Sequence, residues 1–351
     1  MYAVTFFNIT SLTTEVMKHQ QKKTVLRPEQ NRSLTMSRAN RFKLQVAVSM
    51  TFTFVIMLTA VKMGWAQSSN DAYQIKQFAV NNGVEISVET SGGSIDVIGK
   101  DTDEVTVEMY VRKRNRYIQA NDEDLEGWDI EISKSNNKVT AYAKRENSRN
   151  WNWNRNSLSI SFVVYTPKKS TSEVRTSGGS IELANLEGKQ SGRTSGGSIR
   201  AEAINGDLDI RTSGGSITLY EIAGKTEART SGGRIKAENV DGDLDVKTSG
   251  GSISLEGISG SVDASTSGGS INADITAPSE FINLRTSGGS ITVTVPEENG
   301  YDLDLDGNRV RAELKNFTGE YEKDEIKGTV NGGGVKIRAK TSGGSIRLNY
   351  R

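Results

Sequence analysis

The sequence predicts an all-β protein, a single-chain β-solenoid of about 18-residue coils with an irregular N-terminal β-cap. Three observations predict this fold. The tetrapeptide TSGG occurs nine times in 351 residues. Six successive copies follow one another at a constant interval, beginning at Thr176, Thr194, Thr212, Thr230, Thr248 and Thr266. Apolar residues two positions apart follow the copies, as in Ile181 and Leu183, and this alternation is typical of a half-buried strand.

Aligning the copies gives columns of like residues. Each unit is expected to hold a strand, a corner closed by a Gly, a second strand, and a corner at Ser-Gly-Gly. Two short strands cannot bury a face alone. Stacking the units about 4.8 Å apart would pair each strand with its equivalent and join the apolar columns into a core. The first column is Ile181, Ile199, Ile217, Ile235, Ile253 and Ile271.

The chain divides into four regions. Residues 1–35 are polar and aperiodic, and we interpret them as a mis-assigned N-terminal extension, with Met36 as the true start. Residues 36–66 have the order of a signal peptide, with basic residues before the apolar run 44–61 and cleavage expected after Ala66. An uncleaved anchor is the alternative, since the run approaches the length of a membrane span. After cleavage no membrane span is expected.

Residues 67–165 are expected to form the irregular N-terminal β-cap, because terminal repeats are usually atypical. Residues 166–351 are expected to form the β-solenoid. Within them, the stretch from Ala277 to Arg351 is expected to continue the stack with longer loops. The turn pairs that mark those loops are Asn299-Gly300, Asp306-Gly307 and Asn331-Gly332.

Composition excludes several classes of chemistry. The chain has no Cys, and its one His, His19, precedes the expected cleavage site. Without them the Ser-His and Cys-His nucleophile arrangements and the usual zinc sites are missing. We therefore expect no enzyme and no cofactor, although carboxylates or a Ser-Lys pair stay formally open. Residues 67–351 hold 35 basic and 41 acidic residues, a net charge of −6, which argues against a nucleic-acid partner.

An aromatic segment in the N-terminal region is a candidate ligand site. The segment NWNWNRN, residues 150–156, places Trp151 and Trp153 on one face of a strand together with Arg155, and Trp128 lies earlier in the same region. Exposed aromatics beside amides suit sugar rings. The alternative is that these residues cover the open end of the solenoid.

A second candidate is a metal site. Residues 302–313 satisfy the calcium-loop pattern D-x-D-x-D-G-x5-E, with Asp302, Asp304, Asp306 and Glu313 at the ligand spacings. The flanks are not helical, and Tyr301, Leu303 and Leu305 alternate as in a strand. The competing interpretation is an outward acidic face of a strand followed by a turn.

The pattern FxVxxGxxxxVxTSGGSIxV from Phe78 to Val97, the VVYTPK ending of a later strand, and the stacked TSGGSI units together resemble the "putative adhesin" family of bacterial β-strand-repeat proteins. The resemblance covers roughly residues 75 to 350. It implies a location in the bacterial cell envelope and an adhesive role, and it supplies no catalytic residues.

These observations lead to one functional expectation with two alternatives. The chain is expected to be an exported, non-enzymatic structural or binding protein, periplasmic or at the cell surface, that presents a repetitive face to a glycan or a protein. The first alternative is a periplasmic scaffold or envelope-stress accessory protein. The second is a carbohydrate-binding module.

Overall fold

The computed structural model describes residues 72–114, 116–120, 125–146 and 158–351. The described residues contain 26 β-strands and no helix, so the all-β prediction is confirmed. In this part of the chain no segment forms a helix that could cross a membrane. The predicted N-terminal extension and signal peptide lie outside the described residues.

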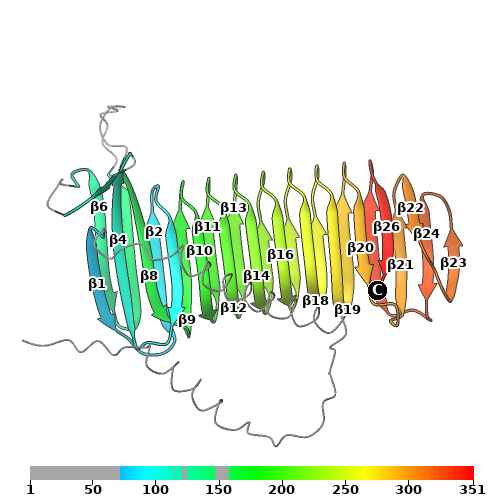
Figure 1. Cartoon of the computed structure of the whole chain (residues 1–351), viewed down its shortest axis with the longest axis horizontal. Coiled ribbons are helices and arrows are strands. Elements are labelled where there is room, and N and C mark those ends of the chain that lie inside the picture. Colours follow the sequence, from blue (N-terminus) through cyan, green and yellow to red (C-terminus); the bar gives the residue numbers. More distant parts are fainter. Residues whose placement is uncertain (1–71, 115, 121–124, 147–157) are drawn as a thin grey trace, which may run out of the picture. The chain divides into compact units, whose positions relative to one another are not determined.

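Parallel strands form two ladders that run along the stack (Figure 1). The Ile ladder contains the strands that begin at the column Ile, namely β10 (Ile181–Glu187), β12 (Ile199–Asn205), β14 (Ile217–Ala223) and β16 (Ile235–Asp241). The Thr ladder contains the strands that end at or just before the Thr of TSGG, namely β9 (Ser170–Thr176), β11 (Gln190–Thr194), β13 (Leu208–Thr212), β15 (Thr226–Arg229) and β17 (Leu244–Lys247).

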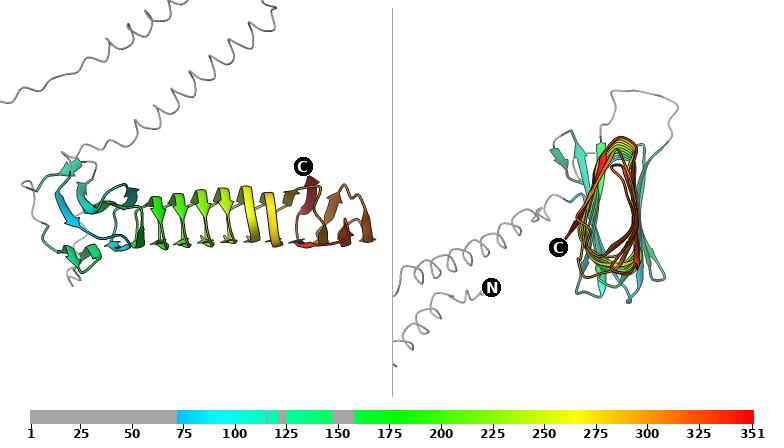
Figure 2. Two further views of the ribbon diagram at one scale, coloured as in Figure 1. Left: turned by 90° about the horizontal axis from the view of Figure 1, so that it is seen from below. Right: turned by 90° about the vertical axis from the view of Figure 1, so that its right-hand side faces the viewer.

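The pairing register follows the sequence period. Ile181 pairs with Ile199, and Ile199 pairs with Ile217, so each strand lies beside its equivalent in the next repeat. Two long strands, β18 (Ile253–Ser265) and β19 (Ile271–Thr286), run through both ladders. Seen along the axis, the successive coils superimpose as a flattened ring (Figure 2). This arrangement is solenoid-like.

The core fills the space between the two ladders. In β10 the side chains of Ile181, Leu183 and Leu186 are buried, while Glu182 and Ala184 face outward. Opposite them, the Thr ladder contributes buried residues such as Ile210. Burying one such aliphatic side chain stabilises a fold by about 1.5–3 kcal/mol. The repeated columns therefore form one continuous apolar core.

The TSGG corners are tied to one another by the Thr side chains. Thr212 Oγ1 donates to the carbonyl of Gly197 at 2.8 Å and accepts from the amide of Gly215 at 3.3 Å. A Cβ at Gly215 would lie 2.0 Å from the carbonyl oxygen of Gly197, so only glycine allows this spacing. The column threonines are at most 6% exposed and are Thr90, Thr176, Thr194, Thr212, Thr230, Thr248, Thr266, Thr286 and Thr341.

The N-terminal end of the stack does not follow chain order. Strand β2 (Val84–Thr90) lies between β7 (Lys138–Arg145) and β9, and β3 (Ile95–Lys100) lies between β8 (Leu158–Pro167) and β10. The first coil of the sequence is therefore internal. Antiparallel strands extend this end, namely β1 (Gln74–Ala79), β4 (Glu104–Lys113), β5 (Arg116–Ile118) and β6 (Trp128–Ser135).

The C-terminal end is also out of chain order. Strand β25 (Val335–Thr341) lies between β19 and β21 (Tyr301–Asp306), and β26 (Ser345–Tyr350) lies between β20 (Ile291–Val295) and β22 (Arg309–Ala312). Strands β24 (Glu325–Val330) and β23 (Phe317–Tyr321) close this end in antiparallel pairing. The stretch after Ala277 thus extends the stack as expected. Its last two strands, β25 and β26, lie between strands that come earlier in the chain.

Candidate binding surface

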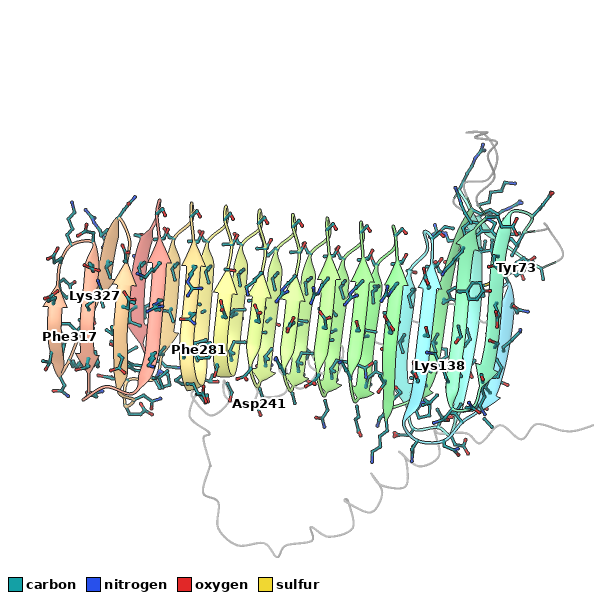
Figure 3. All side chains as sticks on the ribbon, turned by 180° about the vertical axis from the view of Figure 1, so that it is seen from behind. Tyr73, Lys138, Asp241, Phe281, Phe317 and Lys327 are labelled. Atoms are coloured by element: carbon teal, nitrogen blue, oxygen red, sulfur yellow. The ribbon has the colours of Figure 1, made fainter. Side chains whose placement is uncertain are left out.

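The outer face of the Thr ladder carries two adjacent columns of opposite charge. Side chains alternate along a strand, so the residues one and three positions before each column Thr both face outward. The basic column is Arg175, Arg193, Arg211, Arg229 and Lys247, and the acidic column is Glu173, Asp209, Glu227 and Asp245. In Figure 3, Lys138 and Lys327 mark opposite ends of this ladder.

The two columns are joined by ion pairs within coils and between coils. Arg211 Nε lies 2.9 Å from Asp209 in its own coil, and its Nη2 lies 3.4 Å from Glu227 of the next coil. Arg229 contacts Asp245 of the next coil at 3.0 Å in the same way. Although burial acts to raise it, the hydrogen bonds from Arg211 and Arg193 lower the pKa of Asp209. Each exposed pair contributes only about 0–1 kcal/mol, so the network mainly holds the side chains in place and neutralises the face.

A second cluster lies on the outer face of the Ile ladder near its N-terminal end. Asp96 of β3 and Glu182 of β10 are direct neighbours in the parallel register. Burial raises the pKa of Asp96 to about 6. Burial, followed by repulsion from Asp96, raises the pKa of Glu182 to about 7. Carboxyl groups with such pKa values release their protons to the solvent near neutral pH. The charge of this patch therefore changes in that range.

Several tyrosines lie on the strands next to this cluster, and burial together with the charges of Glu108 and Asp96 raises the pKa of one of them, Tyr165. Tyr110 is 3% exposed and donates a hydrogen bond from Oη to Glu108 at 2.7 Å. Its ring lies 6.0 Å from that of Tyr117 in an edge-to-face arrangement. Lys100 Nζ lies 3.3 Å from the centre of the Tyr165 ring. Sequence reasoning missed this cluster. Aligning SIDV at Asp96 with SIEL at Glu182 was the available signal.

Comparison with known proteins adds the family. The model of the Toastrack DUF4097 family matches residues 54–349 of the chain. The chain belongs to this family. The resemblance drawn from the TSGGSI units is thereby confirmed.

Two solved structures are similar to this Toastrack chain. A "putative adhesin" from Bacteroides fragilis is 12% identical with a TM-score of 0.34, and the match covers 78% of this chain and 96% of that one. A "putative cell adhesion protein" from Clostridium sporogenes is 11% identical with a TM-score of 0.24, and the match covers 79% of this chain and 98% of that one. A search of curated proteins found no match.

The predicted aromatic site is only partly visible in the Toastrack structure. Trp151, Trp153 and Arg155 lie outside the described residues. Trp128 begins β6, is 9% exposed and packs in the core. The guanidinium of Arg145 lies 5.2 Å from its ring centre. Trp128 thus packs as a core residue, and it does not offer the exposed ring face that sugar stacking needs.

The structure does not gather the predicted calcium ligands into one group. Residues 301–306 form β21, which confirms the strand interpretation. Asp304 accepts a hydrogen bond from Arg338 Nε at 2.9 Å, and Asp306 lies 3.7 Å from Lys340 Nζ. Asp302 stands on the same strand, and Glu313 follows β22. Among the described residues, His, Cys, Asp and Glu form no group of three or more that could hold a metal ion.

Proposed function

We propose that this Toastrack protein is an exported, non-enzymatic binding protein of the bacterial envelope or cell surface. Its β-solenoid of about 18-residue coils would present a long, regular face to a glycan or a protein. The observation that supports this best is the ion-pair network of the Thr ladder. It repeats the same outward groups in register from Arg193 to Lys247.

A repeating face suits multivalent binding. Neighbouring strands are about 4.8 Å apart, so equivalent side chains recur at that spacing along the axis. Each contact with a repetitive partner can then be weak, because linked contacts raise the overall affinity. The ion pairs also restrain the long side chains before binding, which lowers the entropy lost when a partner orders them.

The charged side chains of the Thr ladder support a non-enzymatic role, because the basic and acidic columns engage each other in ion pairs. The chain has no Cys, and its one His is His19. Cys, the most reactive thiol nucleophile, and His, the usual base near neutral pH, are therefore absent from the sequence after Ala66.

Location on the cell tests the proposal. The protein, carrying a C-terminal tag, is produced in its host, and intact cells are treated with protease while a known periplasmic protein serves as the control. Loss of the tagged protein while the control survives supports a surface role. Protection of both until the outer membrane is opened would favour the periplasmic scaffold instead. Recovery of the protein only from the cytoplasm would refute export.

The aromatic segment stays a prediction within this proposal. Replacing Trp151 and Trp153 with Ala should weaken retention of the protein on immobilised glycans and leave its unfolding temperature unchanged. A lower unfolding temperature with unchanged retention would favour the capping interpretation. If neither quantity changes, the segment is neither a contact nor a cap.

A further inference from the structure

The charge pattern of the Thr ladder breaks in two successive coils. Where β9, β11, β13, β15 and β17 carry Arg or Lys, β18 carries Ser265, and the following strand β19 carries Arg285 beside Asn283. Within the described part of the chain, the Arg285 guanidinium has no ion pair or hydrogen bond, whereas Arg211 contacts two carboxylates. Arg285 thus has no acidic partner in its own coil, where the acidic position holds Asn283, or in the next coil, where that position holds Arg338. It follows a coil whose basic position holds only Ser265.

A groove of about 680 Å³ lies at this break. The short side chain of Ser265 leaves space that an Arg fills in other coils. On the other side, the amide of Gly307 donates to the carbonyl of Asp324 at 2.9 Å and holds the turn between β23 and β24 against the neighbouring corner. The polar residues that line the groove include Ser265, Arg285, Asp306, Asn308, Asp324 and Lys340.

The two cationic side chains of the groove, Lys340 and Arg285, differ in their contacts with carboxylates. Lys340 Nζ lies 3.6 Å from Asp304 and 3.7 Å from Asp306, which are long ion pairs. The Asp306 side chain remains 55% exposed. Arg285 is therefore the cation of the groove that has no ion pair, and Lys340 separates it from Asp306 in the register. Asp306 and Asp324 offer hydrogen-bond acceptors in the same groove. Asn308 donates one amide N–H to the carbonyl of Gly343 at 3.1 Å and keeps its second N–H and its Oδ1 for a ligand.

This set of groups selects a class of ligand. Arg binds a carboxylate through two parallel hydrogen bonds. The carboxylates of Asp306 and Asp324 would repel a doubly charged phosphate but can accept hydrogen bonds from hydroxyl groups. A volume of about 680 Å³ falls in the usual range of roughly 300–1,000 Å³ for small-molecule sites. The net charge of −6 after Ala66 also disfavours a nucleic acid.

We propose that this groove binds a uronic acid unit of an acidic polysaccharide, with the sugar carboxylate on Arg285 and its hydroxyls on Asp306, Asn308 and Asp324. This site extends the proposed function. It rests on that function, because it assumes that the protein meets such a polymer outside the cytoplasm. The ordered ion-pair columns on the N-terminal side of the groove leave Arg285 as the place where the ladder accepts an external anion.

Three variants test the groove. Arg285→Gln removes the guanidinium. Ser265→Glu fills the hollow and places a carboxylate directly beside Arg285, where it pairs with the free guanidinium. Position 265 lies in register between Lys247 and Arg285, so this variant should fold at least as stably as the parent. Arg200→Gln is the matched control, because Arg200 is a partly exposed, ion-paired arginine on the outer face of the Ile ladder, away from the groove, where it contacts Glu202.

The protein is purified after expression of the full chain, and calorimetry measures binding of a galacturonic acid tetrasaccharide and of the neutral galactose tetrasaccharide. We expect the acidic probe to bind at least tenfold more tightly. A hydrogen-bonded charge is worth about 1.5–3 kcal/mol, so Arg285→Gln should weaken binding roughly tenfold to a hundredfold. Ser265→Glu should abolish binding, and Arg200→Gln should change it less than twofold.

Several results would overturn the groove proposal. They are equal binding of the two probes, unchanged affinity in Arg285→Gln, displacement of the acidic probe by an equal concentration of inorganic phosphate, and no binding of either probe by the parent protein. The protease test on intact cells is independent of them. A surface-exposed protein that binds neither probe refutes the groove alone, and a periplasmic protein that binds the acidic probe refutes only the surface location.

Discussion

The second glycine of each TSGG corner is the position where one added methyl group should do most damage. In the coil of β13 and β14 this residue is Gly215. A Cβ there would lie 2.0 Å from the carbonyl oxygen of Gly197 and 2.4 Å from its carbon. Both atoms belong to the backbone of the preceding coil, so no side-chain rotation can relieve the clash. The distance of 2.0 Å must grow by at least about 1.4 Å to reach an ordinary contact, so the two coils must separate locally.

The energetic effect follows from what that separation disrupts. Overpacking a well-packed site costs about 1–3 kcal/mol. The shift also weakens the hydrogen bond from Thr212 to Gly197, which joins the two coils, at about 1 kcal/mol. We therefore expect Gly215→Ala to lower the free energy of unfolding by about 2–4 kcal/mol.

The neighbouring glycine of the same corner is the control. A Cβ at Gly214 would lie 3.5 Å from the nearest atom, the carbonyl oxygen of Gly196, which is an ordinary contact. Gly214→Ala should change the free energy of unfolding by less than about 1 kcal/mol. Urea unfolding followed by circular dichroism measures both variants. Equal effects of the two substitutions would show that inter-coil contact does not explain the glycine at the second position.

Three further substitutions test other parts of the stack. Ala203 has φ 53°, a left-handed conformation that is unfavourable for Ala by about 1–2 kcal/mol, so Ala203→Gly should stabilise the protein by about 0.5–1 kcal/mol after the entropy of glycine is included. In urea unfolding, any loss of stability in this variant would contradict the strain argument. Thr230→Val removes a hydrogen bond to Gly215 and another from Gly233 and should lower the unfolding free energy by about 1–2 kcal/mol, whereas Thr230→Ser should retain most of it. Glu182 has a folded-state pKa raised from 4.5 to about 7, so the folded state binds the extra proton and this contribution to stability is lost as pH rises through 7. Water partly screens this charge, which reduces the effect. Glu182→Gln should be more stable than the parent by about 1–2 kcal/mol at about pH 8 and equally stable at about pH 4. A stability difference of the same size at both pH values would refute the assignment.

The regular coils could be predicted from the sequence because one period satisfies every local requirement. The column Ile, the Gly of each corner and the column Thr each recur once per repeat, and Ile181 pairs with Ile199 in the structure. A strand that must bury one face and pair with its equivalent has only one register that keeps its apolar residues inside. Periodicity therefore indicates both the neighbours and the buried face.

The candidate sites could not be predicted in the same way. Asp96 and Glu182 are far apart in the sequence, yet they become neighbours because β3 lies directly beside β10. The groove at Arg285 needs β25, β21 and the turn before β24 to meet at one corner. Asp302, Asp304 and Asp306 matched a metal-binding pattern, but pairing with β25 brings Arg338 and Lys340 to two of them.

The sequence by itself determined the strand period, the inward columns and the glycine corners, since each depends on residues within one coil or on the equivalent residues of the next. The tertiary structure alone decided how the stack is closed. The coil of β2 and β3 and the coil of β25 and β26 each lie between strands that are distant in the chain. The position of each of these two coils depends on which strands it pairs with after a long intervening segment of chain. The local repeat does not determine that pairing.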